Sequence, residues 1–317
     1  MTQIRIGSRG SQLALWQANH IAAQLRANGH AVEIEIIRTT GDRMQQPGFV
    51  MPPGVDGKGI FIKEIEEALA AGRIDLAVHS LKDLPTALDS RFALAAIPPR
   101  ADARDAFVCE PYWALHTLPD RSRIGTTSPR RRAQLLALRP DLRFVELRGN
   151  VDTRLRKLEE GACDALVLAC AGLDRLGRNE SVHQRFDIDE LTPAPGQGAL
   201  ALETRSPRHA LDTEDPARDA GIFAAISALD DPATRFAVHA ERAFLGAMGG
   251  GCEMPLGAHC LTTGHGWSLH AQVLQPDGEQ TIQLTVDSLI NESAQELGQR
   301  TAEDLIRLGA LDLLQPA

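Results

Sequence analysis

Residues 3–28 read QIRIGSRGSQLALWQANHIAAQLRAN, and this stretch decides the fold class. Gln3–Ser8 reads as a strand, and Ser11–Asn28 has apolar residues at roughly helical spacing, which predicts a helix. The order continues with a strand at Ala31–Arg38, a helix at Gly59–Ala71 and a buried strand at Ile74–His79. Strands separated by helices of this size predict an α/β fold with a mostly parallel sheet.

The strand–helix pattern restarts after Arg104. Strands are predicted at Arg123–Thr127, Arg143–Leu147 and Ala165–Ala169, with helices at Pro129–Leu138 and Val151–Glu160 between them. The turn-rich segment from Leu191 to Gly198 ends this second α/β unit and precedes a strand at Ala199–Glu203.

A third region begins near Gly221 and has a different order of elements. Its predicted elements are a helix at Pro232–Ala247, strands at Leu256–Leu261, Ser268–Leu274 and Gln280–Val286, and a last helix at Glu292–Leu308. This order predicts a small α+β domain. The earlier tract Gln45–Asp56 is rich in Pro and Gly and has no periodicity, which predicts a loop.

The chain has 317 residues, a formal net charge of −9 and five cysteines. This length predicts two or three domains that can fold without disulfides. An odd number of cysteines with no Cys-x-x-Cys pair indicates a reducing compartment and no structural zinc. The sequence also has no apolar signal segment and no run of about 20 apolar residues. We therefore expect a cytoplasmic protein.

Positive charge is concentrated in one part of this acidic chain. Between Arg121 and Lys157 there are ten arginines and one lysine against three acidic residues, a local surplus of eight positive charges. Single surface charges contribute little, so each arginine taken alone reads as part of a solvated helix face. Taken together they favour a ligand site, because several of them follow successive strands, where open α/β sheets bind ligands.

Arginines follow three of the predicted strands. Arg130 and Arg131 come after the turn Gly125–Ser128 at the start of a helix, where free backbone N–H groups attract anions. The remaining members of the set are Arg132 in the same run, Arg148 and Arg154 after the next strand, and Arg9 with Ser11 after the first. Guanidinium groups match carboxylates in a bidentate way, so a cleft lined by them suits a polycarboxylate or polyphosphate.

Two further segments could carry chemistry. In His79–Pro85 an apolar strand ends in polar residues, and Asp83 could transfer a proton, stabilise a cation, or act only as a capping or surface residue. His79 could equally be a half-buried histidine with its own partner. In Gly249–Cys252 three glycines are costly to order, and they would let a ligand approach a nucleophilic thiol. The alternative for Cys252 is an ordinary buried cysteine in a turn.

Other site classes are not supported by the sequence. It contains no phosphate-binding Gly-x-x-x-x-Gly-Lys-Ser/Thr, no dinucleotide-binding Gly-x-Gly-x-x-Gly after a strand and no His-Glu-x-x-His. We therefore predict no metal site. With one Tyr and three Trp, the chain offers few platforms for base stacking, which argues against nucleic acid as a partner.

Read in order, motifs along nearly the whole chain closely resemble the porphobilinogen deaminase family, also called hydroxymethylbilane synthases. The matching stretches are Ile6–Leu15, Thr40–Asp42, Gly57–Glu64, His79–Pro85, Gly125–Arg132, Leu147–Arg154, Pro195–Gly198, and Ala240–Arg242 leading to Gly250–Cys252. The resemblance implies a transferase of haem biosynthesis. Such enzymes join four porphobilinogen molecules head to tail, release ammonia at each step and give hydroxymethylbilane.

The resemblance also implies a cofactor and a set of site residues. One dipyrromethane would be joined by a thioether to Cys252, and it would prime the chain. Asp83 would stabilise the cationic azafulvene that forms when ammonia leaves. The groups that hold the cofactor would be Lys82, Asp83, Ser128, Arg130 and Arg131, and those that hold substrate or growing chain would be Arg9, Ser11, Arg148, Arg154, Arg175 and Gln197.

The family fold implies two α/β domains like those of periplasmic binding proteins around a cleft, and a small α+β C-terminal domain that carries the cysteine. We expect a discontinuous first domain of residues 1–101 with 201–220, a second of 102–200 and a third of 221–317. The expected protein is a monomer that binds porphobilinogen, with neither nucleic acid nor membrane as partner. Two rivals remain: a two-lobed solute-binding or effector-sensing module for a polycarboxylate, and a thiol-dependent transferase of another substrate.

Overall fold

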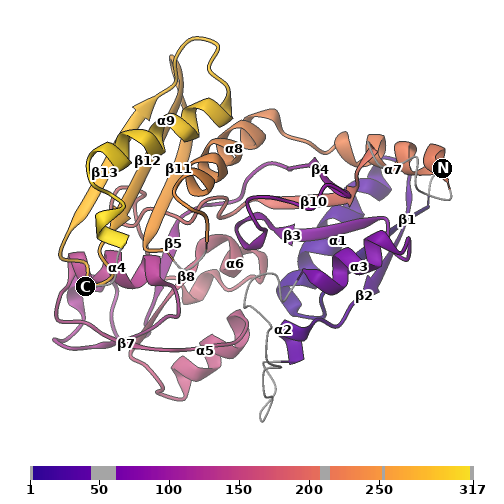
Figure 1. Cartoon of the computed structure of the whole chain (residues 1–317). Helices are drawn as coiled ribbons and strands as arrows, with labels where there is room; N and C mark the ends of the chain where they lie inside the picture. Colours follow the sequence, from indigo (N-terminus) through magenta and orange to yellow (C-terminus); the bar gives the residue numbers. More distant parts are fainter. Residues whose placement is uncertain (1–2, 44–61, 208–214, 252–253, 315–317) are drawn as a thin grey trace. The chain divides into compact units, whose positions relative to one another are not determined.

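The computed structural model describes residues 3–43, 62–207, 215–251 and 254–314 (Figure 1). The chain divides into two compact units. Unit 1 comprises Met1–Arg100 with Ala199–Arg235, and unit 2 comprises Ala101–Gly198 with Phe236–Ala317. Each unit therefore contains two separate stretches of chain.

Unit 1 is built on a five-stranded mixed sheet in the order β2-β1-β3-β10-β4. The strands are β1 (Gln3–Ser8), β2 (Ala31–Ile36), β3 (Leu76–Ser80), β4 (Phe92–Ala96) and β10 (Leu200–Arg205). Strand β1 runs parallel to β2 and β3, whereas β10 runs antiparallel to β3 and β4. The carboxyl ends of β1, β2 and β3 therefore lie at the same edge as the amino end of β10.

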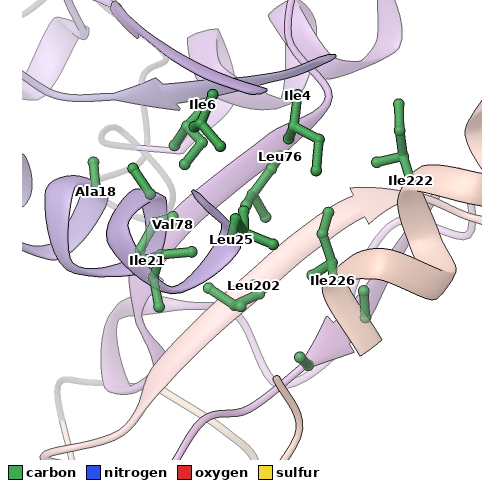
Figure 2. Close-up of a cluster of buried hydrophobic side chains, with 14 of the residues drawn as sticks. Ile4, Ile6, Ala18, Ile21, Leu25, Leu76, Val78, Leu202, Ile222 and Ile226 are labelled. Atoms are coloured by element: carbon green, nitrogen blue, oxygen red, sulfur yellow. The ribbon is translucent and has the colours of Figure 1, made fainter. Parts of the chain in front are cut away.

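Helices cover both faces of this sheet. On one face, α1 (Gln12–Ala27) and α7 (Pro216–Ser227) bury apolar side chains against the strands. Figure 2 shows Ile21 and Leu25 of α1 and Ile226 of α7 directed toward the same core as Leu202 of the sheet. On the other face, α3 (Lys63–Ala70) packs Ile65, Ala68 and Leu69 in a second core. The short α2 (Thr40–Arg43) follows β2.

Unit 2 contains a second five-stranded mixed sheet, in the order β7-β6-β8-β5-β9. Its strands are β5 (Asp105–Val108), β6 (Arg123–Gly125), β7 (Arg143–Val145), β8 (Ala165–Ala169) and β9 (Gln184–Arg185). Strand β6 is parallel to β7 and β8, and β5 is antiparallel to β8. The helices α4 (Pro129–Leu138), α5 (Val151–Glu159) and α6 (Cys170–Arg175) follow β6, β7 and β8.

The C-terminal part of unit 2 is an antiparallel sheet of β11 (Leu256–Thr263), β12 (Gly266–Leu274) and β13 (Thr281–Asp287) with two helices. Helix α8 (Pro232–Ala247) precedes the sheet, and α9 (Ala294–Arg307) follows it. Phe244 of α8 and Leu297 of α9 share a buried core with Leu269 of β12. Helix α9 begins with a capping box, in which Ser293 and Glu296 satisfy each other's backbone N–H groups.

The predicted class, two α/β sheets and a small α+β part, is confirmed. The expectation of a mostly parallel sheet holds for strand direction, because four of the five strands of each sheet run the same way. The exceptions are β10 in unit 1 and β5 in unit 2, which run antiparallel to both of their neighbours. The sequence reading also missed β4, β5, β9 and α7. The predicted boundary after residue 220 falls inside α7, and the three-domain division stays a prediction. Among the described residues, no helix is long and apolar enough to cross a membrane.

Candidate functional site

In unit 1, predicted site residues gather at the edge of the sheet where β1 and β3 end. Arg9 follows β1, and Lys82 and Asp83 form a 3₁₀ turn (Leu81–Asp83) directly after β3. The Leu81 N–H donates to the Ala199 carbonyl at 3.0 Å, which fixes the turn to the chain entering β10. Asp83 is exposed and Lys82 is half-buried. This edge therefore presents an accessible carboxylate.

Buried polar contacts support the strand that carries this turn. The Gln17 amide of α1 donates to the Ser80 hydroxyl at 2.9 Å. His79 Nε2 lies 3.1 Å from Glu203 Oε2, and both side chains are buried between β3 and β10. Burial, followed by the charge of Glu203, raises the pKa of the nearby Glu66 carboxyl. His79 is thus a buried histidine with its own partner.

Ser11 caps α1, because its hydroxyl accepts a hydrogen bond from the Ala14 N–H at 3.3 Å. The hydroxyl can still donate a hydrogen to a ligand. Its assignment to substrate binding, like that of Arg9, stays a prediction.

In unit 2, the centre of the site is a carboxylate that the sequence reading missed. Asp105, at the amino end of β5, is fully buried. Its Oδ2 accepts from Arg130 Nη2 at 2.7 Å, and its Oδ1 accepts from Arg131 Nε and Nη2 at 3.1 and 2.6 Å. Gln197 Nε2 donates to the same Oδ1 at 3.0 Å. The structure therefore brings Arg130, Arg131 and Gln197 together around one acid.

The segment around Thr192 extends this cluster. Arg130 Nη1 donates to the Thr192 carbonyl at 2.6 Å, and the Gln134 amide both donates to that carbonyl and accepts from the Thr192 N–H. The Thr192 hydroxyl donates to Gln272 Oε1 of β12 at 3.0 Å. The arginine helix α4 is thus joined to the C-terminal sheet of unit 2.

The buried charges of this cluster change the pKa values of Asp105 and Arg130. Burial alone would raise the pKa of the Asp105 carboxyl, but the charges of Arg130 and Arg131 outweigh burial and hold that pKa well below its usual range. Burial lowers the pKa of the Arg130 guanidinium, against the opposing effect of Asp105. Arg130 and Arg131 are only 4% and 6% exposed, so little of either guanidinium meets solvent.

The donor set around α4 fits a ligand that bears carboxylates. Arg130 Nε is buried and has no hydrogen-bond partner among the residues that the structure describes. Ser128 caps the helix by accepting from the Arg131 N–H at 3.4 Å, and the helix start adds further N–H groups. The acetate and propionate groups of a dipyrromethane are acceptors of the kind that such donors bind.

The other predicted arginines of unit 2 have different partners. Arg148 is 77% exposed at the side chain and lies 3.7 Å from Glu146. Arg154 Nε donates to the Gly149 carbonyl at 2.9 Å. Arg175 Nη2 donates to the Gly198 carbonyl at 2.7 Å, and burial lowers the pKa of its guanidinium to about 10. Their roles toward substrate stay predictions.

Helix α8 ends in the glycines that precede Cys252. Gly249, Gly250 and Gly251 have φ values of 98°, 59° and 153°, a region that other residues rarely adopt. The Gly250 N–H donates to the Leu245 carbonyl at 2.9 Å and closes the helix. Cys252 itself lies outside the described residues, as does the predicted loop Gln45–Asp56.

The remaining cysteines do not compete for the role of nucleophile. Cys109, Cys163, Cys170 and Cys260 are buried, and none of these four forms a disulfide. Burial raises the pKa of Cys163 to about 11 and that of Cys170 to about 12, so both stay protonated near neutral pH.

A buried glutamate connects α8 to the segment that carries Gln197. Glu241 Oε2 accepts from the Gly196 N–H at 2.7 Å, and its Oε1 accepts from the Cys260 N–H at 2.9 Å. Among the described residues, no group of three or more His, Cys, Asp or Glu side chains is arranged to hold a metal ion.

Asp105 carried one signal in the sequence, since it stands as a charged residue at the head of the apolar run Ala106–Val108. An acid that begins a fully buried strand needs a partner, and basic residues are the usual choice. The sequence does not show which basic residues those are.

Comparisons with known proteins identify the family. A model described as "Porphobilinogen deaminase, dipyromethane cofactor binding domain" matches residues 4–213, and one for the C-terminal domain of porphobilinogen deaminase matches residues 235–307. Porphobilinogen deaminase of Acidothermus cellulolyticus is 47% identical over 99% of this chain and 92% of its own. That of Rubrobacter xylanophilus is 46% identical over 98% and 95%.

Among solved structures, the methionine binding protein MetQ is 15% identical over 71% of this chain and 89% of its own, with a TM-score of 0.42. The sequence relatives support the transferase over the solute-binding alternative. With both family models and relatives that cover nearly its whole length, the chain belongs to the porphobilinogen deaminase family.

Proposed function

We propose that this chain condenses four porphobilinogen molecules head to tail, with loss of ammonia at each addition. Water then cleaves the bond between the dipyrromethane and the four added units, supplies the hydroxyl group and releases hydroxymethylbilane. The reaction starts on one dipyrromethane attached through Cys252. The observation that carries this proposal is the match of residues 4–213 to a dipyrromethane-binding domain model. The bound dipyrromethane supplies the pyrrole carbon to which the first substrate is joined.

Asp83 is the proposed catalytic residue. Its carboxylate is exposed on a turn held by Leu81 at the end of β3, so it is accessible to a substrate at this edge. A fixed negative charge there stabilises the positive charge that develops on the substrate as ammonia leaves. The same carboxylate can accept a hydrogen bond from a pyrrole N–H.

Recognition of carboxylates falls to the basic residues. Lys82, Ser128, Arg130 and Arg131 are proposed to hold those of the cofactor, supported for Arg130 by its unsatisfied Nε. The proposed contacts to substrate and growing chain come from Arg9, Ser11, Arg148, Arg154, Arg175 and Gln197. Each pyrrole added brings an acetate and a propionate, so the need for positive charge grows with the chain.

The proposed setting is a monomer in the cytoplasm. Support for a reducing compartment comes from the four described cysteines, none of which forms a disulfide. The proposed site residues all come from one chain, so the reaction needs no second copy. Analytical ultracentrifugation of the purified protein tests the monomer.

Intact-mass spectrometry tests the function. The purified chain is expected to weigh more than its sequence by one dipyrromethane, and Cys252→Ser is expected to lose both the added mass and the turnover of porphobilinogen. Cys163→Ala, which removes a buried thiol, is the matched control and should keep the adduct. An active wild-type protein without added mass would refute the proposal.

A further inference from the structure

The buried carboxylate of Asp105 takes no part in the reaction as proposed, yet three residues assigned to ligand binding meet on it. Arg130 and Arg131 approach from α4, and Gln197 comes from the turn before β10. These contacts join residues that lie 25, 26 and 92 positions from Asp105 in the sequence. Asp105 is therefore the common partner of two separate segments.

The geometry restricts how the two guanidinium groups can point. Each takes a different carboxylate oxygen, Arg130 at 2.7 Å on Oδ2 and Arg131 at 2.6 Å on Oδ1. Without such an anchor, an arginine side chain samples many rotamers and must be ordered when a ligand binds. With it, the direction of each group is set before binding.

Asp105 also sets the charge of the cluster. Two guanidinium groups and one carboxylate leave a single net positive charge in a site that is almost closed to solvent. Two uncompensated cations at this depth would repel each other and would be costly to desolvate. A single excess charge suits one incoming carboxylate.

We propose that Asp105 is a positioning residue, which orients Arg130 and Arg131 and leaves between them the charge that receives one carboxylate of the dipyrromethane. This inference rests on the proposed function. The buried Nε of Arg130, for which the described part of the chain offers no hydrogen-bond partner, is a donor that this carboxylate would satisfy.

A second aspartate in unit 2 provides a matched control. Asp102 also lies between two arginines, with Arg104 Nη2 at 2.9 Å and Arg185 Nη1 at 2.8 Å from its Oδ2. Neither arginine is assigned to a ligand, and Asp102 is partly exposed. Asp102→Asn therefore removes the same kind of ion pair from two arginines that have no proposed role toward a ligand.

The test compares Asp105→Asn, Asp105→Glu and Asp102→Asn with the wild type, each purified as the full chain. Three quantities are measured: the fraction of chains that carry the dipyrromethane mass, the thermal midpoint, and kcat and KM per loaded chain. For Asp105→Asn we expect a several-fold smaller loaded fraction and a loss of kcat/KM of roughly 100-fold, mainly through KM. Asp105→Glu should recover part of both, and Asp102→Asn should keep both.

A loaded fraction and KM for Asp105→Asn equal to those of Asp102→Asn would overturn the proposal and leave Asp105 a purely structural ion pair. If Asp105→Asn does not fold, Asp105→Glu decides, because it keeps the charge and moves the carboxylate; wild-type loading and KM in that variant would likewise overturn the proposal. A wild type without adduct would instead refute the proposed function, so the two failures are distinguishable.

Discussion

Two aspartates at strand ends, Asp83 in unit 1 and Asp105 in unit 2, stand in opposite environments. Asp83 follows β3 on a short turn and is exposed. Asp105 begins β5, is fully buried and accepts hydrogen bonds from three side chains. The first carboxylate can meet a ligand, whereas the oxygens of the second already have partners.

The two environments give the same type of side chain two different roles. An exposed carboxylate contributes little to folding, so its replacement reports on chemistry. A buried carboxylate between cations holds its partners in place, so its replacement reports first on stability and on the placement of those partners. Each of the following predictions tests whether that separation holds.

The largest expected effect is on turnover in Asp83→Ala. Loss of the carboxylate that stabilises the developing cation should lower kcat by about 10²- to 10³-fold. The free energy of unfolding should change by no more than about 0.5 kcal/mol, because the side chain is exposed. Asp89→Ala, which removes an exposed carboxylate of the same segment, should keep full turnover. Near-normal kcat in Asp83→Ala would remove Asp83 from the mechanism.

The next effect is on stability and concerns a buried aspartate far from any proposed ligand. Asp75 in unit 1 is buried, with Arg5 and Arg218 each 2.8 Å from its carboxylate. Asp75→Asn should lower the free energy of unfolding by about 3–5 kcal/mol, because it leaves arginines without their acid. Urea denaturation measures this. The half-exposed pair of Asp164 with Arg123 gives the control, Asp164→Asn, which should cost less than about 1 kcal/mol.

The stability of the protein at low pH should depend on two buried aspartates, Asp75 and Asp105. Burial alone would raise the pKa of Asp75 and of Asp105, but their arginines hold both values well below the usual range. Their contribution to stability is therefore complete above about pH 4, where an unfolded aspartate is ionised, and is lost as pH falls toward the folded-state pKa. The thermal midpoint should fall steeply below that pH, and less steeply in Asp75→Asn. Equal slopes would contradict the assignment.

Among the basic residues, Arg148 is the exposed counterpart of Asp83. Its side chain is 77% exposed, so Arg148→Leu should leave the fold intact and weaken only the binding of the growing chain. We expect enzyme-bound oligomers to accumulate at a shorter length, seen as added masses in intact-mass spectra during turnover. Arg156→Leu on α5, the helix that follows Arg148, is the control, and an unchanged oligomer distribution in Arg148→Leu would count against chain holding.

The smallest expected effect comes from backbone packing behind the arginine helix. A Cβ on Gly278 would lie 2.6 Å from the Ala133 carbonyl and from the Ala137 nitrogen of α4. Gly278→Ala should therefore cost about 1–3 kcal/mol beyond its backbone strain. Gly72 has a similar φ of +66° with open space around it, so Gly72→Ala measures the strain alone. An equal loss of unfolding free energy in Gly278→Ala and Gly72→Ala would show that α4 shifts freely to make room for the turn between β12 and β13.

Local patterns in the sequence predicted most elements well. Helices α4 and α8 have the predicted bounds, since Pro129 and Pro232 mark their starts. Strands β5 and β9 are only four and two residues long, which is too short for a periodic signal. The antiparallel direction of β10 depends on where the chain returns to the first sheet, and no local pattern records that.

The candidate site was predicted in composition but not in arrangement. The sequence placed Arg130 and Arg131 at a strand end, and the structure agrees. It could not show that both turn toward Asp105, because such pairing depends on side chains far apart in the sequence. The prediction that Cys252 carries the cofactor came from the family resemblance, and the residue lies outside the described part of the chain.

The contacts of Glu241 restrict which second mutations can compensate for its loss. Both of its oxygens accept hydrogen bonds from backbone N–H groups, those of Gly196 and Cys260, and Oε1 also lies 3.5 Å from His259 Nδ1. A lost side-chain partner can be restored by a second mutation that supplies a new donor, but a backbone N–H is the same in every residue except proline. A genetic screen for suppressors of a Glu241 substitution should therefore recover reversion at codon 241 and no compensating change at codons 196 or 260.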